Sequence, residues 1–382
     1  MNSASIALFD VALAARSALL DARHESAVRL FNGFVEGLPN LVVDLCGTTL
    51  VLHDYAAGEE GDEPLAREAT DHIARKFPWI TCAVWKRRHA RSLALRNGTL
   101  LLGDERQLTR KVREGGVWYA LATTHYRDVG FYPDTRPLRA WARAGLAGKR
   151  VFNTFAHTGS LGVAARAAGA HVLHTDLSRR SLNVGKDSYA LNGWPIDKRD
   201  FRAGDFFNVV GQLKRDEQLF DCVFIDPPFF SVTARGRVDL QANARQVLNR
   251  VRPLIADGGT LAFVNNAAFL SGAEHMASLE ALCGDGYLSL EQIVPTPEDT
   301  AGFAATRVGT LAIDPSPFNH STKMVILRVK RKDGRPATTG GGAGSPKAAR
   351  KKKPREGRAR SKSRKPQGAS ARVARKRIHT AG

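Results

Sequence analysis

Two different patterns of hydrophobic and polar positions divide the chain. Between residue 25 and about residue 118, short alternating runs such as NLVVDLCGTTLVLHD are broken by turn signals such as GLPN. Alternation with a period of two predicts β-strands, whereas EPLAREATDHIARKF has helical spacing. We therefore expect residues 25–118 to form a small α+β domain. Ahead of it, Ile6, Phe9 and Leu13 predict an amphipathic helix within residues 1–24.

From residue 119 the chain alternates between strand, glycine turn and helix. The runs KRVFNTF, HVLHTD, FDCVFID and GGTLAFVNN read as strands, and AHTGSLGVAARAAGA reads as a turn that enters a helix. Such alternation predicts a parallel sheet with helices on both faces. The expected fold class is α/β, with a Rossmann-like, doubly wound domain over residues 119–330.

Charge is concentrated at the C-terminal end of the sequence. The whole chain has a net charge of +20, and residues 331–382 supply +16 of it. This tail is rich in Gly, Ser, Pro and basic residues and has few large apolar ones, which predicts a disordered polycation. Its expected partner is RNA or DNA, bound through the phosphates, although a solubilising or localisation role would need the same composition.

The remaining composition points to a soluble, cytoplasmic protein with no membrane partner. The sequence has no run of 18 or more apolar residues and does not begin with a secretory signal. The four cysteines stand far apart, without a CxxC pair or metal-ligand spacing. We expect reduced thiols, no disulfide and no metal site.

Candidate functional residues fall at the carboxyl ends of the predicted parallel strands, where open α/β sheets bind ligands. Thr158 and Gly159 form a tight turn after the first strand, and Asp176 ends the second strand, where a carboxylate can accept both hydroxyls of a ribose. Asp205 and Phe206 follow a third strand, where they can bind an adenine amine and cover its ring. Each signal alone also fits an ordinary turn, strand end or core residue.

The stretch DPPFF after the fourth strand is more specific. Asp226 ends the strand, and Pro227 and Pro228 make a stiff turn without amide N–H groups. The turn would place Phe229 beside the cleft, where it could stack on a base whose amine meets Asp226. The alternative is a proline-terminated strand with two core phenylalanines.

Four stretches of the sequence together resemble a known family. They are RLFNGFVEGLPNLVVDLCGTTLVL, DVGFYPDTRPLRAW, VFNTFAHTGSLGVAARAAGAHVLHTDLS and FDCVFIDPPFFS. These motifs, over residues 10–330, resemble class I S-adenosylmethionine-dependent methyltransferases, and more narrowly the bacterial large-subunit ribosomal RNA methyltransferases I and K/L. The resemblance implies a transferase that uses S-adenosyl-L-methionine and acts on ribosomal RNA or a ribosomal precursor particle.

The resemblance also implies roles for individual residues. The cofactor-binding residues would be Asp134, Arg136, Asn153, Thr158, Gly159, Ser160, Asp176, Leu177, Asp205, Phe206 and Asp226. Asp226, Pro227, Pro228 and Phe229 would form the catalytic clamp for the target base. Asn265 and Asn266 would join Phe229 in binding the substrate, although asparagines at a strand end are also common turn formers.

The segment FVNNAAFLSG differs from methyltransferase I, whose 5-methylcytosine chemistry needs a cysteine nucleophile after the fifth strand. No cysteine occurs in this segment, and its two asparagines resemble the K/L C-terminal domain instead. We therefore expect methylation of a purine nitrogen such as guanine N7 or N2. The alternatives are a 5-methylcytosine enzyme, or a methyltransferase of proteins or small molecules.

Two other classes fit less well. A non-catalytic RNA-binding protein would not need Gly159, Asp176 and Asp226 together, and a nicotinamide-dependent dehydrogenase would need the full GxGxxG pattern. The sequence also begins near the linker helix of the resembled enzymes, without their extra RNA-binding module. The basic tail is expected to replace that module, and the domain of residues 25–118 is expected to face RNA.

Overall fold

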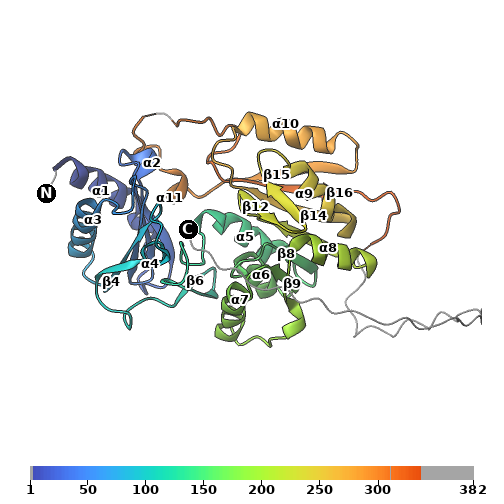
Figure 1. The fold of residues 1–382 in the computed structure, drawn as a ribbon, viewed down its shortest axis with the longest axis horizontal. Coiled ribbons are helices and arrows are strands. Elements are labelled where there is room, and N and C mark those ends of the chain that lie inside the picture. Colours follow the sequence, from blue (N-terminus) through green and yellow to red (C-terminus); the bar gives the residue numbers. More distant parts are fainter. Residues whose placement is uncertain (1–2, 310, 337–382) are drawn as a thin grey trace, which may run out of the picture. The chain divides into compact units, whose positions relative to one another are not determined.

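The computed structural model describes residues 3–309 and 311–336 of the chain (Figure 1). Most of the predicted basic tail, from residue 337 onward, lies outside the described residues. Two main sheets and two separate hairpins make up the β-structure of the described part. No helix of this part has the length and hydropathy needed to cross a membrane.

The first sheet is built from residues 27–102, in the strand order β1-β2-β3-β4-β5. All neighbours are antiparallel except β3 and β4, which are parallel and are connected by helix α3 (Glu63–Lys76). Helix α1 (Ser3–Arg16) buries Phe9 and Leu13 in the same core. The strands are β1 (Ala27–Asn32), β2 (Leu41–Cys46), β3 (Thr49–Asp54), β4 (Cys82–Arg87) and β5 (Thr99–Leu102).

The segment RLFNGF contains the end of a strand and the start of a helix. β1 ends at Asn32, and the short helix α2 (Gly33–Glu36) follows directly. A Cβ atom at Gly33 would lie 1.8 Å from the carbonyl oxygen of Leu38 and 2.3 Å from that of Leu41. Only glycine allows this close approach of backbone to backbone, so the turn into β2 depends on it.

The second sheet confirms the predicted doubly wound α/β fold. Its order is β10-β9-β8-β11-β14-β16-β15; the first five strands are parallel, and β16 runs antiparallel to both of its neighbours. The chain order reverses between β8 and β11, which is where ligands bind in such sheets. The strands are β8 (Arg150–Thr154), β9 (His171–Asp176), β10 (Phe201–Ala203), β11 (Phe220–Ile225), β14 (Ile255–Asn265), β15 (Leu288–Val294) and β16 (Lys323–Val329).

Helices cover both faces of this second sheet (Figure 1). One face packs against α8, α9 and α10, and the other against α5 and α6, with α7 beside α6. The helices are α5 (Arg136–Gly145), α6 (Ser160–Ala167), α7 (Arg179–Leu191), α8 (Phe206–Arg215), α9 (Ala244–Val251) and α10 (Gly272–Cys283).

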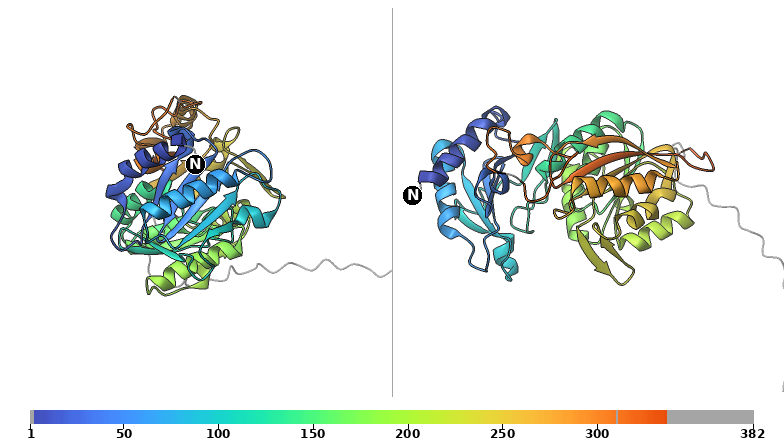
Figure 2. Two further views of the ribbon diagram at one scale, coloured as in Figure 1. Left: turned by 90° about the vertical axis from the view of Figure 1, so that its left-hand side faces the viewer. Right: turned by 90° about the horizontal axis from the view of Figure 1, so that it is seen from above.

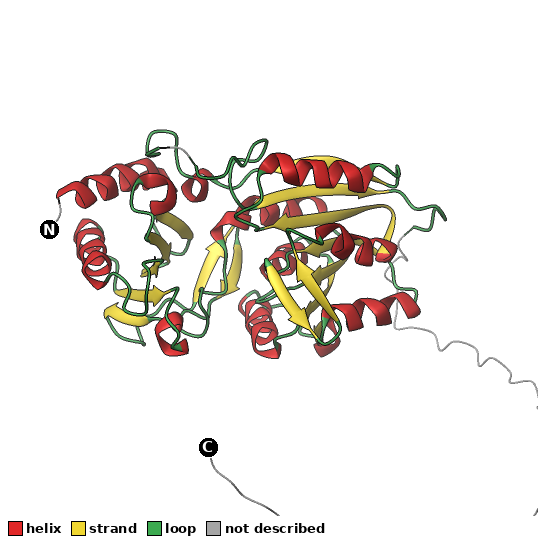
Figure 3. Ribbon diagram, turned by 45° about the horizontal axis from the view of Figure 1, so that its top comes forward, coloured by secondary structure: helices red, strands yellow, loops and turns green. Residues whose placement is uncertain are grey.

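Two hairpins complete the β-structure of the described residues. β6 (Lys111–Glu114) and β7 (Val117–Ala120) pack with α7 and with residues of the first sheet in a shared core. β12 (Phe230–Thr233) and β13 (Gly236–Asp239) form a two-stranded element directly after DPPF, which projects from the second sheet (Figures 2 and 3). Neither phenylalanine of DPPFF enters the core. Phe229 is 36% exposed, and Phe230, which begins this hairpin, is 51% exposed.

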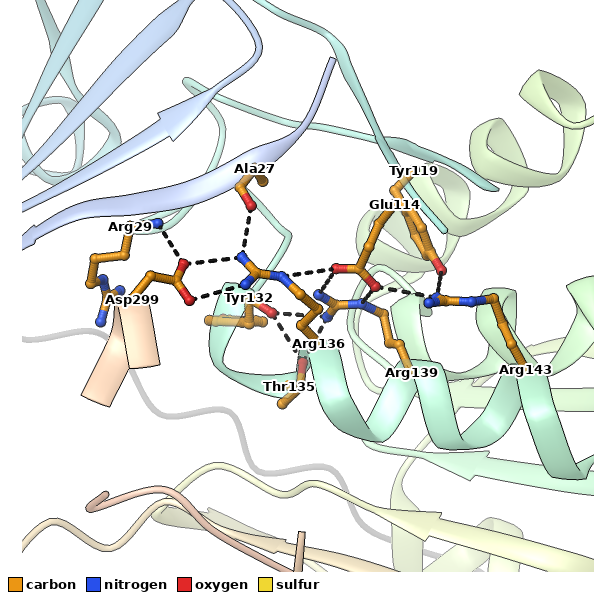
Figure 4. Close-up of polar contacts among 10 residues, drawn as sticks. All are labelled: Ala27, Arg29, Glu114, Tyr119, Tyr132, Thr135, Arg136, Arg139, Arg143 and Asp299. Carbon is orange, nitrogen blue, oxygen red and sulfur yellow. Dashed lines mark hydrogen bonds and ion pairs between the residues drawn. The ribbon is translucent and has the colours of Figure 1, made fainter. Parts of the chain in front are cut away.

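A late segment of the chain returns to the first sheet. Helix α11 (Glu298–Ala301) carries Asp299, whose buried carboxylate accepts hydrogen bonds from the Arg29 amide (3.1 Å) and from both Nη atoms of Arg136 (3.0 and 3.1 Å) (Figure 4). Arg136 also donates to the Ala27 carbonyl at 2.9 Å. A single boundary at residue 118 does not describe these contacts, because residues 298–308 belong with the N-terminal strands.

Candidate active site

A cavity of about 470 Å³ opens at the carboxyl edge of the second sheet, at the β8–β11 switch point. Most of the residues predicted from the sequence line it. These are Asp134, Asn153, Thr158, Ser160, Asp176, Leu177, Asp205, Phe206, Asp226, Pro227, Pro228 and Asn266. The ends of four strands therefore meet in one cavity, as their order along the chain predicted.

The turn after β8 is shaped by left-handed backbone. Phe155 (φ 49°), His157 (φ 50°) and Gly159 (φ 82°) all have positive φ, which is uncommon for side chains larger than glycine. The Thr158 hydroxyl donates to the Gly130 carbonyl, and a Cβ at Gly159 would lie 3.1 Å from His174 Nδ1. The backbone strain is therefore held by contacts with neighbouring segments, and the turn leads into the N-terminus of α6.

Asp176 ends β9 and faces the cavity. Its Oδ2 accepts from the His157 amide and its Oδ1 from the Ser178 amide, both at 2.8 Å. These two bonds orient the carboxylate, and each oxygen keeps a further lone pair for a ligand hydroxyl. Leu177, 69% exposed, lies at the rim of the cavity.

Asp205 and Phe206 form the next part of the wall. Asp205 caps α8, because its Oδ1 accepts from the Asn208 amide at 3.2 Å. Its Oδ2 is buried and has no hydrogen-bond partner among the described residues. The Phe206 ring is buried and stacks on Phe155 at 4.5 Å. A buried, unpaired acceptor beside aromatic rings fits a flat ligand that carries an amino group.

Asp134 also presents a free acceptor to the cavity. Its Oδ2 accepts from the Thr322 hydroxyl at 3.0 Å, while Oδ1 is buried without a partner among the described residues. Three carboxylates thus have lone pairs directed to one apolar-walled space. A ligand for this space must therefore supply several hydrogen-bond donors. An adenosine with an added amino acid group does so through its hydroxyl, amino and ammonium groups.

Asp226 is a cavity carboxylate with a raised pKa. It directly follows β11, and its burial, together with the nearby Asp134 charge, raises its pKa to about 7. The next residue is held in place, because the Pro227 carbonyl accepts from Asn266 Nδ2 at 3.2 Å. A carboxyl group that titrates near neutrality in a cleft is typical of functional sites.

Four of the predicted residues do not line the cavity: Gly159, whose turn is described above, Arg136, Phe229 and Asn265. Arg136 is engaged with Asp299 and Ala27 in the network of Figure 4. Asn265 is fully buried, with Nδ2 3.2 Å from His275 Nδ1 and Oδ1 accepting from the Ala267 amide. Phe229 is partly exposed beside the cavity but does not line it. We therefore do not assign ligand contacts to Arg136 or Asn265.

Other lining residues were not predicted individually. His157 and Tyr132 lie within motifs that the sequence singled out, AHTG and FYPDTR, but their side chains were not assigned. Ser231, Val232 and Thr233 come from the β12–β13 hairpin. The alternation of apolar and polar residues in SVTARGRV could have predicted that hairpin. In the structure Val238 is buried and Val232 is exposed.

Cysteine chemistry and metal ligation are not provided at this cavity. All four cysteines lie within the described residues, and none lines it. Burial raises the pKa of the Cys46 and Cys222 thiols far above the usual range, so neither is a ready nucleophile. Within the described part of the chain, no cluster of three or more His, Cys, Asp or Glu residues could hold a metal ion.

Comparison with known proteins agrees with this geometry. Residues 80–282 match the family model described as S-adenosylmethionine-dependent methyltransferase. The chain belongs to this family. Membership confirms S-adenosylmethionine as the expected cofactor.

Curated relatives of this methyltransferase are named for ribosomal RNA. Over 264 residues it is 30% identical to ribosomal RNA large subunit methyltransferase I of Shewanella amazonensis, which covers 65% of this chain and 63% of that protein. Over 186 residues it is 34% identical to methyltransferase K/L of Psychrobacter, covering 47% of this chain and 23% of the relative. The match therefore spans less than two thirds of either relative.

Solved structures show the same fold. SMU.776, solved in complex with SAH, superposes with a TM-score of 0.72 at 19% identity, over 86% of this chain and 81% of that one. A SAM-dependent methyltransferase from Agrobacterium tumefaciens gives a TM-score of 0.52 at 18% identity, over 76% of this chain and 87% of that one. At these identities the likeness concerns the arrangement of elements.

Proposed function

We propose that this methyltransferase uses S-adenosylmethionine to methylate a base of large-subunit ribosomal RNA, at a purine nitrogen such as guanine N7 or N2. The observation that carries the proposal is the position of the Asp226–Pro228 turn, which shares one cavity with the carboxylates suited to the cofactor. The names of the Shewanella and Psychrobacter relatives supply the substrate class. An RNA substrate also suits a chain with a net charge of +20.

In this proposal, the residues around the β8 and β9 ends bind the cofactor. Asp176 accepts the ribose hydroxyls, Asp205 Oδ2 accepts the adenine amino group, and Phe206 lies against the ring. Thr158, Ser160 and Asn153 line the remaining wall, and Asp134 offers its free Oδ1 to the ammonium group. When bound, S-adenosylmethionine supplies an electrophilic methyl group.

The chain's own residues then hold the base that is extruded from the RNA. Asp226 and the Pro227 carbonyl accept hydrogen bonds from amine and ring N–H groups of the base, and Asn266 holds that carbonyl in place. A carboxyl group with a pKa of about 7 can take up a proton from an exocyclic amine as it is methylated. Positioning of this kind supplies several of the ~7–11 kcal/mol that proximity can contribute.

The absence of a cysteine from the cavity wall favours a nitrogen target. Attack on cytosine C6 needs a thiolate within reach of the base, and none of the four cysteines lines this cavity. A purine nitrogen uses its own lone pair and needs no covalent intermediate with the protein. The 5-methylcytosine alternative is thus disfavoured, and the RNA-named relatives weigh against a protein or small-molecule substrate. We further propose that the enzyme works in the cytoplasm, where ribosomes assemble.

Mass spectrometry of nucleosides from ribosomal RNA tests the proposal. Cells that lack the gene should lose one methylated purine nucleoside, which wild-type protein restores and the Asp226→Ala variant does not. Asp216→Ala, which changes an exposed aspartate at the end of α8, should restore it fully. Loss of 5-methylcytidine would overturn the purine assignment, and an unchanged profile would overturn the RNA substrate.

A further inference from the structure

Three arginines that form no salt bridge within the described residues lie outside the cavity. Arg88 directly follows β4, Arg96 belongs to α4 (Leu93–Asn97), and Arg127 lies in the loop that leads to Tyr132; β4 and α4 are labelled in Figure 1. We call Arg88, Arg96 and Arg127 the arginine patch. The patch combines side chains from the first sheet and from the loop 122–132.

The positive charge of this patch is only partly offset, by the Asp128 carboxylate, whose charge acts on Arg88 and Arg127. Among residues 3–309 and 311–336, no carboxylate forms a salt bridge with any of its three guanidinium groups. Partial burial, and then repulsion from Arg88 and Arg96, lowers the pKa of Arg127. The Nε atoms of Arg88 and Arg96 are buried and have no hydrogen-bond partner in the same residues. An anion placed here would relieve the repulsion among the three guanidinium groups.

Hydrogen bonds hold the patch in position. Arg127 Nη2 donates to the Arg88 carbonyl at 2.9 Å, and Arg88 Nη1 donates to the Arg127 carbonyl. Beneath them, the buried Lys86 ammonium donates to the carbonyls of Thr123 (2.6 Å) and Tyr126 (2.9 Å). These bonds fix the loop 122–132 to β4 and reduce the ordering entropy that ligand binding would cost.

Aromatic side chains border the arginines. The Arg88 guanidinium lies 5.6 Å from the centroid of the Tyr55 ring, and Tyr55 meets the Phe34 ring edge-on at 4.9 Å. Phe34 is 53% exposed, which is unusual for a phenylalanine, and His89 lies 6.4 Å from Tyr55. Guanidinium groups next to exposed rings are the combination that binds single-stranded nucleic acid, through phosphate contacts and base stacking.

The loop 122–132, which carries Arg127, also reaches the cavity. Asp128, next to Arg127, accepts from the Tyr132 hydroxyl at 2.6 Å, and Tyr132 lines the cavity. Tyr126, on the other side of Arg127, packs edge-on against the cavity residue His157 at 5.2 Å. The loop that contributes Arg127 to the patch therefore also contributes Tyr132 to the cavity wall.

We propose that the arginine patch, with Tyr55 and Phe34, binds the phosphates and unstacked bases of single-stranded RNA that flanks the target nucleotide. This inference rests on the proposed function, because it assumes an RNA substrate. It assigns RNA contact to a defined face of the first sheet, independently of the basic tail.

Anisotropy titrations of the full chain test this inference, with a fluorescein-labelled single-stranded RNA of about 15 nucleotides. We expect Arg96→Gln/Arg127→Gln to weaken binding about tenfold at low salt and to make the slope of log K against log salt less steep by about 1.4. The matched control, Arg67→Gln/Arg75→Gln, removes two charges from exposed positions on α3 of the same sheet domain. It should change both quantities much less.

The outcomes separate this inference from the proposed function. If the patch variant and the α3 control bind RNA equally well, the patch assignment is wrong while the methyltransferase proposal stands. If the wild-type chain binds neither this RNA nor ribosomal RNA, the substrate proposal itself fails. Cofactor affinity, measured by calorimetry, should be the same in all variants, because the substituted side chains do not line the cavity.

Discussion

Asp226 illustrates how the site is built at the expense of stability. Its pKa in the folded state, about 7, is higher than the ordinary value of 3.8, because burial and Asp134 disfavour the carboxylate. Protonated Asp226 is therefore favoured by folding. Its stabilising contribution is complete below about pH 4, and it is lost as the pH rises to about 7.

The Asp226→Asn variant should show this loss as a pH-dependent gain. Its free energy of unfolding should exceed that of the wild type by about 1–3 kcal/mol above pH 7 and by much less near pH 4. Urea denaturation at several pH values measures the difference. A difference that does not depend on pH would contradict the raised pKa. The same variant should lose methyl transfer, since the amide is a poorer acceptor for the N–H groups of the base and cannot take up a proton from an exocyclic amine.

Asp205 caps α8, and in the proposed site it also binds the cofactor. Asp205→Ala should lower S-adenosylmethionine affinity about tenfold through loss of one hydrogen bond, and should also lose about 1 kcal/mol of stability through loss of the α8 cap. Asp205→Ser retains a capping oxygen and should lose affinity alone. Calorimetry and urea denaturation compare the two; equal affinity for wild type and Asp205→Ser would remove Asp205 from the cofactor site.

At the scale of elements, the short helix α11 stabilises the joint between β1 and α5. Asp299→Asn would remove the closer of two carboxylates paired with Arg136, at 3.0 Å, and leave Glu114 at 3.8 Å, so it should lower the free energy of unfolding by about 1–3 kcal/mol. Glu291→Gln, which breaks an exposed pair with Arg328, should cost less than about 1 kcal/mol. Urea denaturation of both variants is the measurement. Equal losses would show that the Asp299 network does not stabilise the joint.

The β12–β13 hairpin is an element whose exposed face should serve the substrate rather than stability. Phe230 is 51% exposed, with the Arg237 guanidinium 5.0 Å from its ring centroid. Phe230→Ala should weaken RNA binding by about 1–3 kcal/mol, because a base loses its stacking partner. Its melting temperature and cofactor affinity should stay unchanged. Val11→Ala, at an equally exposed position on α1, provides the comparison in the same RNA titration.

At the scale of the whole molecule, charge should set the salt dependence of RNA binding. Residues 331–382 carry +16 of the net charge, and most of them lie outside the described residues. Deleting residues 337–382 should raise the Kd for RNA and flatten its salt slope further than the patch variant does, because more counterions are released by the intact chain. An unchanged slope in the anisotropy titration would exclude a role for the tail in RNA binding.

The sequence by itself determined the order of strands and helices and the chemistry at the strand ends. Asp176, Asp205 and Asp226 were predictable because local patterns place them after buried strands, and parallel strands end at one edge. The glycine turn at Gly159 was predictable for the same local reason. The residue types at these positions then favoured a nucleoside cofactor.

Only the tertiary structure decided where Arg136 and Asn265 lie and which segments meet. Arg136 and Asp299 are 163 positions apart in the sequence, and Asn265 bonds to His275 on a different element. No local pattern specifies such partners. A buried polar side chain forms its hydrogen bonds with groups that lie next to it once the elements have packed, and these groups come from distant parts of the sequence. The arginine patch likewise exists only because loop 122–132 is held against β4, which brings together charges that are separated along the chain.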